Sequence, residues 1–196
     1  MKIYRKASEP ESSALEPVSE IKNLRTGDII YYDGTLVTGR DEVYHRVVQD
    51  KIMPPLDLKD AAIYHAGPIV KETPPEKSSC VRGWELVSIG PTSSIRMEKW
   101  AADFIRITGV KIMIGKGGMG EKTAAACRQY GSIHCVYPGG CAVLGASQIE
   151  KIEDCFWPEF TMAECMWVMR TYSGKKSFGP LIVSIDTRGN NLFTKR

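Results

Sequence analysis

Residues 110–137 read VKIMIGKGGMGEKTAAACRQYGSIHCVY, an order of apolar and polar runs that indicates strand, turn, helix and strand. The apolar run at Val110–Ile114 predicts a buried strand, and Glu121–Tyr130 predicts a helix that ends at Gly131. A second strand is expected at Ile133–Tyr137. A helix between two buried strands is typical of a parallel pair, so this stretch favours an α/β sheet covered by helices.

The same alternation continues on both sides of this unit. Upstream, Ser93–Ile107 is a predicted helix closed by Gly109. Downstream, a short helix is expected at Ala142–Ala146, and the apolar runs Trp167–Arg170 and Leu181–Asp186 are predicted strands. These elements enlarge the sheet, which we expect to be partly parallel.

The first third of the chain is predicted to be mostly β structure. Asp28–Thr38 indicates two strands joined by a turn at Asp33-Gly34, since glycine tolerates the positive φ of such a turn. The other predicted elements here are a helix at Arg40–Gln49, a strand at Ala61–Ala66, a loop at Pro74–Ser79 and a strand at Trp84–Ile89. This region suggests an additional sheet or barrel-like layer, which gives a three-layer α/β domain.

Length and composition suit one globular domain. With 196 residues, 43% of them hydrophobic, the chain can bury enough surface to offset its conformational entropy. Residues 1–20 show little apolar periodicity and are predicted to form a flexible arm. Residues 21–196 are therefore expected to be the single domain.

Charge and cysteine usage exclude several classes of function. A net charge of +3 is too mild and too scattered to predict a nucleic-acid partner. The sequence shows no signal peptide and no apolar run long enough to span a bilayer, so we expect a cytoplasmic protein with no membrane partner. No Cys-x-x-Cys pair occurs, which argues against a metal site held by this chain alone. The six cysteines are Cys80, Cys127, Cys135, Cys141, Cys155 and Cys165.

The segment Gly90–Met97 joins a predicted strand to a predicted helix. Ser93 or Ser94 would cap that helix, and the unpaired N–H groups at its start attract a carboxylate. Arg96 adds a guanidinium whose fork matches carboxylate geometry. A capped helix with a surface arginine explains the same residues, so this segment alone leaves both interpretations open.

The segment Gly115–Gly120 forms a second junction of this kind. Lys116 would place a cation at the carboxyl edge of the sheet, where open α/β sheets bind ligands, although a mobile surface turn is the alternative. A nucleotide-binding P-loop is disfavoured, because Glu121 stands between Gly120 and Lys122. It shifts the lysine out of register and puts a negative charge beside the supposed phosphate.

Two more glycine turns precede candidate residues. Arg40 opens a predicted helix and offers a second guanidinium, while Asp41 suits the first turn of that helix electrostatically. His45, one turn beyond, is interpreted as a structural histidine. Cys141 lies near a helix N-terminus, a position that can make a thiol reactive, but no histidine adjoins it in sequence to act as its base. A structural role is favoured for Cys141.

Five segments, in this order along the chain, resemble the β subunit of class I fumarases and L(+)-tartrate dehydratases. They are Thr38–Asp41, His65–Pro68, Gly90–Met97, Gly115–Met119 and Gly179–Thr187. The likeness extends over roughly residues 25–193. Five motifs in sequence are far more specific than a single short match.

The resemblance implies a hydro-lyase that acts on a small dicarboxylate. The family's substrate-facing residues fall on Arg40, Arg96 and Lys116, which would bind the carboxylates, and on Thr92, which would be the base that removes a proton from carbon. Fumarate hydration to malate is the first interpretation and L(+)-tartrate dehydration the second. A non-catalytic domain that binds an anion or a protein is the alternative from another class.

The resemblance also implies a fold, a cofactor and a partner. The fold would be a swivelling β/β/α domain, which agrees in class with the three-layer prediction. The [4Fe–4S] cluster would belong to a partner α subunit in an α2β2 heterotetramer, with none bound by this chain alone. Asp41, Ser93 and Gly115 would support the substrate-binding side chains.

Two departures from the family's pattern stand out. Asp41 and His45 are separated by one more residue than the family's first motif usually has, which rotates His45 by about 100° on a helix. We therefore expect no active-site role for His45. Ser93 stands where fumarases commonly have a second threonine, a change that keeps the hydroxyl.

Overall fold

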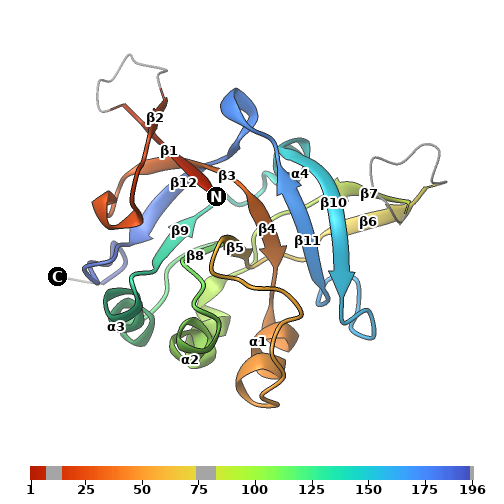
Figure 1. The fold of residues 1–196 in the computed structure, drawn as a ribbon, viewed down its shortest axis with the longest axis horizontal. Helices are drawn as coiled ribbons and strands as arrows, with labels where there is room; N and C mark the ends of the chain where they lie inside the picture. Colours follow the sequence, from red (N-terminus) through yellow and green to blue (C-terminus); the bar gives the residue numbers. More distant parts are fainter. Residues whose placement is uncertain (8–14, 74–82, 195–196) are drawn as a thin grey trace.

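The structure is a computed structural model that describes residues 1–7, 15–73 and 83–194 (Figure 1). The predicted loop at Pro74–Ser79 lies outside these residues. The strands of the main sheet are β1 (Lys2–Lys6), β2 (Leu15–Pro17), β3 (Ile29–Asp33), β4 (Thr35–Thr38), β5 (Ala61–Tyr64), β8 (Ile112–Gly115), β9 (Ile133–Val136), β10 (Ile149–Phe156), β11 (Met166–Thr171) and β12 (Phe178–Ile185). The helices are α1 (Asp41–Val48), α2 (Glu98–Thr108), α3 (Glu121–Tyr130) and α4 (Ala142–Ser147).

The main sheet is mixed, with the strand order β10-β11-β4-β5-β8-β9-β12-β3-β1-β2. Its middle strands β4, β5, β8 and β9 run parallel, and the other neighbours run antiparallel. A parallel pair needs a crossover connection, and α1, α2 and α3 supply these. The three helices cover the same face of the parallel strands (Figure 1). The predicted α/β class with a partly parallel sheet is confirmed.

β3 and β4 follow each other directly in the chain but lie in different halves of the strand order. The sheet must therefore curl to bring them together. Both strands predicted in Asp28–Thr38 form, but the turn predicted at Asp33-Gly34 is wrong, since β3 pairs with β1 and β12 whereas β4 pairs with β5 and β11. Gly34 is not among the residues with positive φ. Close packing requires the glycine instead, because a Cβ there would lie 2.8 Å from the Tyr32 hydroxyl. One run thus belongs to both halves of the strand order, which produces the barrel-like layer.

Apolar clusters fill both sides of this sheet. The inner cluster lies within the curl and includes Tyr32, Tyr64 and Phe178. The outer cluster joins the sheet to α1–α3, where the rings of Tyr44 and Phe104 stack 4.1 Å apart. Each fully buried large side chain contributes about 1.5–3 kcal/mol. The two clusters together fix the helices and the strand ends relative to one another.

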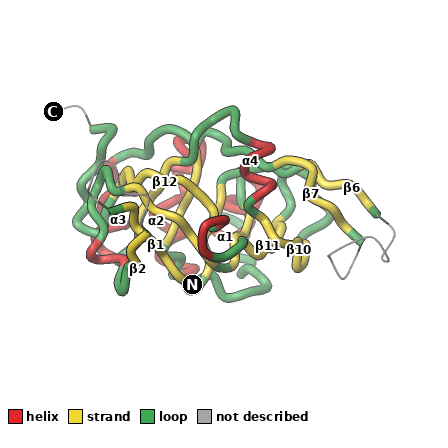
Figure 2. Tube along the Cα trace, turned by 90° about the horizontal axis from the view of Figure 1, so that it is seen from above, coloured by secondary structure: helices red, strands yellow, loops and turns green. Residues whose placement is uncertain are grey.

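The N-terminal segment differs from the sequence prediction, whereas the predicted strand at Trp84–Ile89 belongs to a second sheet. Residues 1–20 were predicted to be a flexible arm, but Lys2–Lys6 pairs with β3 in the main sheet and Leu15–Pro17 pairs with β1. A second, two-stranded sheet consists of β6 (Ile69–Glu72) and β7 (Trp84–Ser88). Figure 2 shows that it extends away from the main body on the side of α4.

The start of α2 also differs from its prediction. A 3-10 turn at Ser94–Met97 precedes the helix, and neither Ser93 nor Ser94 acts as a side-chain cap. The Ser94 hydroxyl is fully buried and contacts two histidines instead. The helix ends at Gly109 as predicted. None of the described helices has the length and apolarity that crossing a membrane requires.

Candidate active site

The carboxyl ends of the parallel strands bring the candidate residues to one edge of the sheet. Arg40 follows β4 and Lys116 follows β8, while Thr92 lies between the ends of β5 and β8. The turn after β9 is also close, because a Cβ on Gly139 would lie 3.3 Å from Lys116 Cδ. Ligands of open α/β sheets bind at this edge. It is therefore the candidate active site.

Main-chain hydrogen bonds join Thr92 to Lys116. The Thr92 N–H donates to the His65 carbonyl at 2.7 Å, and the Lys116 N–H donates to the Thr92 carbonyl at 3.0 Å. The Ser94 N–H in turn donates to the Lys116 carbonyl at 2.9 Å. The Lys116 side chain is exposed and forms no ion pair with a described residue. Its ammonium group is therefore available to an anion.

Arg40 is the most buried cation of the site, and its partner was not predicted from the sequence. Its Nη2 lies 3.0 Å from Glu164 Oε1, and these side chains are only 19% and 17% exposed. The guanidinium lies over Gly67, where a Cβ would approach Nη1 to 2.6 Å. Within the described part of the chain, Arg40 Nε is buried and has no hydrogen-bond partner. One donor of the guanidinium thus remains unused.

Arg96 and Asp41 form the second ion pair of the site. Arg96 Nη2 lies 2.5 Å from Asp41 Oδ2, and the arginine side chain is about half exposed. Both ion pairs lie within electrostatic range of each other, because Asp41 and Arg96 affect the titration of Glu164. Burial raises the pKa of the Glu164 carboxyl above its usual value, against the opposing effect of Arg40. The predicted carboxylate clamp is thus occupied by the protein's own acids.

The structure keeps His45 and Cys141 apart from these ion pairs. His45 lies near the end of α1, with its Nδ1 3.5 Å from Asp50 Oδ2 and its ring edge-on to Trp100. Cys141 is the half-buried N-cap residue of α4 and makes no side-chain capping bond. Neither residue contacts Arg40 or Lys116 in any described interaction. Structural roles for both remain our interpretation.

Beneath the site lies Ser94 together with four residues that the sequence did not indicate as site residues. His65 Nδ1 and His134 Nε2 each lie 2.9 Å from Ser94 Oγ. Tyr44 Oη lies 2.7 Å from His65 Nε2, and Ser184 Oγ lies 2.5 Å from His134 Nδ1. All five side chains are fully buried. Their only signal in the sequence was the inclusion of His65, Ser94 and Ser184 in the family motifs.

The N-terminus of α3 argues against nucleotide binding. In a P-loop the backbone N–H groups at this position hold phosphate. Here the Glu98 carboxylate accepts bonds from the Gly120 N–H at 2.7 Å and from the Thr123 hydroxyl at 2.5 Å. An internal carboxylate thus fills the place of the phosphate.

The thiols of the described residues do not fit an iron–sulfur cluster. Such a cluster needs three or four converging thiolates, whereas no group of three or more His, Cys, Asp or Glu side chains in the described ranges could hold a metal ion. Burial raises the pKa of Cys127 to about 12, which disfavours its thiolate. Cys155 and Cys165 come within 3.5 Å of each other, but two sulfur atoms do not supply the three or four thiolates that a cluster needs.

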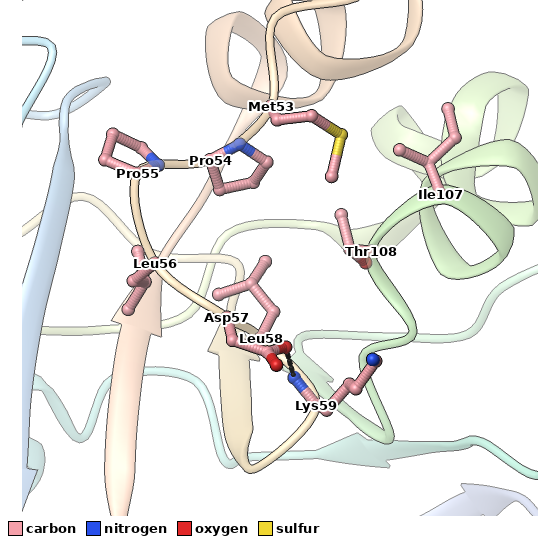
Figure 3. A pocket seen from close by; sticks show the side chains of 9 residues that line it. All are labelled: Met53, Pro54, Pro55, Leu56, Asp57, Leu58, Lys59, Ile107 and Thr108. Carbon is pink, nitrogen blue, oxygen red and sulfur yellow. Dashed lines mark hydrogen bonds between the residues drawn. The ribbon is translucent and has the colours of Figure 1, made fainter.

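Two hollows border different edges of the sheet. An open depression of about 360 Å³ lies beside the site and is lined by Ser93, Ile95, Lys116, Met119 and Phe193, among others. A groove of about 450 Å³ lies at the opposite edge, where Met53–Lys59 meets Ile107 and Thr108 (Figure 3). Its Asp57 carboxylate accepts the N–H of Lys59 (Figure 3). Only the first hollow borders the candidate residues.

Replacing Gly115 by alanine is expected to destabilise the fold by about 1–3 kcal/mol, the usual cost of overpacking. The new Cβ would lie 1.9 Å from Ser94 Oγ and 2.8 Å from His65 Nδ1. Urea denaturation followed by circular dichroism measures the loss. Gly139→Ala is the control, because its nearest neighbour is the flexible Lys116 side chain. Equal stability of the two variants would contradict the close packing at Gly115.

Comparison with known proteins places the chain in an established family. The model of the fumarase C-terminus family matches residues 11–196, so this chain is a member of that family. It is 48% identical to the L(+)-tartrate dehydratase β subunits of Escherichia coli strain K12 and Shigella flexneri, over 90% of this chain and 82% of each relative. It is 35% identical to a Geobacillus stearothermophilus protein provisionally named class I fumarate hydratase, over 90% of this chain and 32% of that protein.

These names describe dehydratases and hydratases, both of which are hydro-lyases. Two of the three relatives are β subunits, a name that implies a partner subunit. The resemblance stated from the five sequence motifs is thereby confirmed. The chain is the β subunit, or the equivalent region, of a class I fumarase-type hydro-lyase.

Proposed function

We propose that this chain binds a four-carbon 2-hydroxy dicarboxylate through Arg40, Arg96 and Lys116 and removes its C3 proton with Thr92. The observation that most supports this is the pairing of both arginines with internal carboxylates, Glu164 and Asp41. Guanidinium groups match carboxylates in geometry, so the substrate carboxylates would take the place of the internal ones, while Lys116 supplies the cation without a described ion pair.

Each cation has capacity for a substrate group. Arg40 Nε has no described partner but is buried, so a substrate carboxylate would bind this guanidinium by displacing Glu164. Arg96 is about half exposed and could exchange Asp41 for substrate. Lys116 has no described ion pair to break. Together the three cations would hold both carboxylates and fix the carbon between them near Thr92.

Thr92 would take the C3 proton as the C2 hydroxyl leaves, and the electrons of the C–H bond would form the new double bond. A threonine hydroxyl is a weak base, so it needs stabilisation from nearby cations and N–H groups. Lys116 is the cation on the neighbouring segment, because its N–H bonds to the Thr92 carbonyl. The assignment of Thr92 as the base comes from the family resemblance.

The ranking of the two candidate substrates differs from the one that the motifs suggested. L(+)-tartrate dehydration now comes first, because the relatives with that name share 48% identity over most of their length. Fumarate hydration is second, supported by the 35% identity to the provisionally named fumarate hydratase. The same clamp accepts either substrate, since both are four-carbon dicarboxylates.

The partner in this proposal is a cytoplasmic α subunit that holds the [4Fe–4S] cluster, in an α2β2 assembly. The exposed apolar side chains Ile95 and Phe193, 56% and 53% exposed, border the depression beside Lys116 and suit a protein contact. Anaerobic copurification with an iron–sulfur subunit, followed by parallel assays on L(+)-tartrate, malate and fumarate, tests partner and substrate together. If the chain purifies without an iron–sulfur subunit and shows no turnover, the result would favour a non-catalytic anion- or protein-binding domain.

Lys116→Met is expected to raise KM roughly tenfold to a hundredfold, because a hydrogen bond to a charged group is worth about 1.5–3 kcal/mol. Steady-state kinetics of the assembled enzyme measure the change. Lys175→Met is the matched control, because Lys175 is an exposed lysine in a turn remote from the parallel strand ends. Equal KM values for the two variants would remove Lys116 from the clamp.

A further inference from the structure

The five buried side chains beneath the site form one continuous chain of hydrogen bonds. The order is Tyr44, His65, Ser94, His134 and Ser184, and the four contacts between them measure 2.5–2.9 Å. This hydrogen-bond network runs from α1 to β12, through His65 after β5 and His134 in β9. A buried polar network of this kind is stable only when each donor meets an acceptor.

One end of the hydrogen-bond network fixes which atom donates and which accepts in every contact. The Ser184 hydroxyl donates to the His134 carbonyl at 3.0 Å, and a carbonyl can only accept. Ser184 Oγ must then accept from His134 Nδ1–H, which leaves His134 Nε2 to accept the Ser94 hydroxyl proton. Ser94 Oγ accepts from His65 Nδ1–H, and His65 Nε2 accepts from Tyr44. Both histidines are thus neutral Nδ1–H tautomers, and every group is satisfied.

The neutral state agrees with the surroundings of the two rings. Burial lowers the pKa of His134 to about 3. Burial and the neighbouring His134 also lower the pKa of His65 well below its usual value. A protonated ring could not accept a hydrogen bond from Tyr44 or Ser94, so protonation would break that hydrogen bond.

Ser94 connects this network to the candidate base and the candidate clamp. Its hydroxyl bonds to the His65 ring, and the His65 carbonyl accepts the N–H of Thr92. The Thr92 carbonyl accepts the N–H of Lys116, whose own carbonyl accepts the N–H of Ser94. These four bonds close a ring through three segments. Gly115 leaves room for it, because a Cβ there would collide with the Ser94 hydroxyl.

We infer that Ser94, held between His65 and His134, is a positioning residue that fixes Thr92 relative to Lys116. This inference rests on the proposed hydro-lyase function. An apolar residue could fill the same volume but could not connect the two rings, because only a hydroxyl accepts from one histidine and donates to the other. The network therefore determines where the base and the clamp stand.

The kinetic test uses Ser94→Ala and Ser177→Ala in the assembled enzyme. Ser94→Ala is expected to lower kcat roughly tenfold to a hundredfold, because misplacing a reacting group by about 1 Å costs of that order, and to leave KM within about threefold. Ser177 is the matched control, since its buried hydroxyl has no hydrogen-bond partner among the described residues. Its replacement should leave kcat unchanged. A folded Ser94→Ala enzyme with wild-type kcat would overturn the inference.

A second test begins with a measurement on the wild-type chain that depends neither on activity nor on a folded variant, and then adds one variant. Nitrogen-15 NMR of the wild-type full chain should show His65 and His134 both as neutral Nδ1–H tautomers at pH 7. Ser184→Ala, which removes the acceptor of His134 Nδ1–H, should shift the His134 tautomer and lower kcat in the assembled enzyme. An Nε2–H tautomer or a charged ring in the wild type would overturn the inference. Absent turnover by the wild-type enzyme, with the predicted tautomers present, would instead contradict the proposed function.

Discussion

Replacing Thr92 by alanine in the assembled enzyme is expected to lower kcat by about two to four orders of magnitude, the usual contribution of a positioned general base. The KM should change little, because Arg40, Arg96 and Lys116 would still hold the carboxylates. The main chain at Thr92 should keep its bonds to His65 and Lys116, since the substitution removes only the hydroxyl and a methyl group. Assays with L(+)-tartrate and with malate measure the loss.

Thr92→Ser is the matched variant, because it keeps the hydroxyl in the same position. We expect it to retain at least a tenth of the wild-type kcat. Thr92 is partly exposed, so neither variant should alter thermal stability by more than the small amounts typical of surface positions. Turnover within twofold of wild type in Thr92→Ala would exclude Thr92 as the base and direct the search to another residue of this edge.

The fold should lose stability between pH 8 and pH 5 because of His65 and His134, with about 2 kcal/mol of the loss from His134 alone. Burial places the folded-state pKa of both rings below the ordinary value of 6.5, for His134 at about 3. Between the two values the unfolded chain binds more protons than the folded chain, so stability falls as pH falls through 6.5. His65 adds to the loss in the same direction. Urea denaturation at pH 5, 6, 7 and 8 measures the slope.

A histidine variant separates this effect from the titration of the acids. His134→Gln removes one of the two buried rings, so it should reduce the proton uptake on unfolding by up to one proton. Glu164 acts in the opposite direction, since burial raises the pKa of its carboxyl and the folded chain binds that proton more tightly. A wild-type stability that is flat from pH 8 to pH 5 would show that the rings are not buried as neutral groups.

The two predictions concern neighbouring parts of one structure. The buried histidines hold the main chain of Thr92 through the His65 carbonyl, while the hydroxyl of Thr92 faces the substrate edge in the proposal. Both rings stay neutral in the folded chain at pH 5, so the fall in stability reflects protonation of the unfolded chain and leaves Thr92 in place. Between pH 8 and pH 5, enzyme that remains folded should therefore lose no activity through these two rings, although its stability falls.

The sequence predicted the elements whose formation depends on nearby residues. The helix Glu121–Tyr130 and its end at Gly131 agree with the structure, as do the strands on either side. The strands β1 and β10 were not predicted, because their sequences mix charged and apolar residues and become strands by pairing with β3 and β11. The break at Gly34 could not be recognised either, since close packing against Tyr32 requires the glycine there.

The sequence by itself determined the α/β class, the family, and the placement of Arg40, Thr92 and Lys116 at the turns that follow strands. Local periodicity and short motifs record such features, because they depend on residues only a few positions apart. The tertiary structure alone decided that Glu164 neutralises Arg40 and that Ser94 joins His65 to His134. These contacts arise from strand order and from the curl of the sheet, which bring distant segments together. Burial then makes them specific, because a buried polar group without a partner is costly.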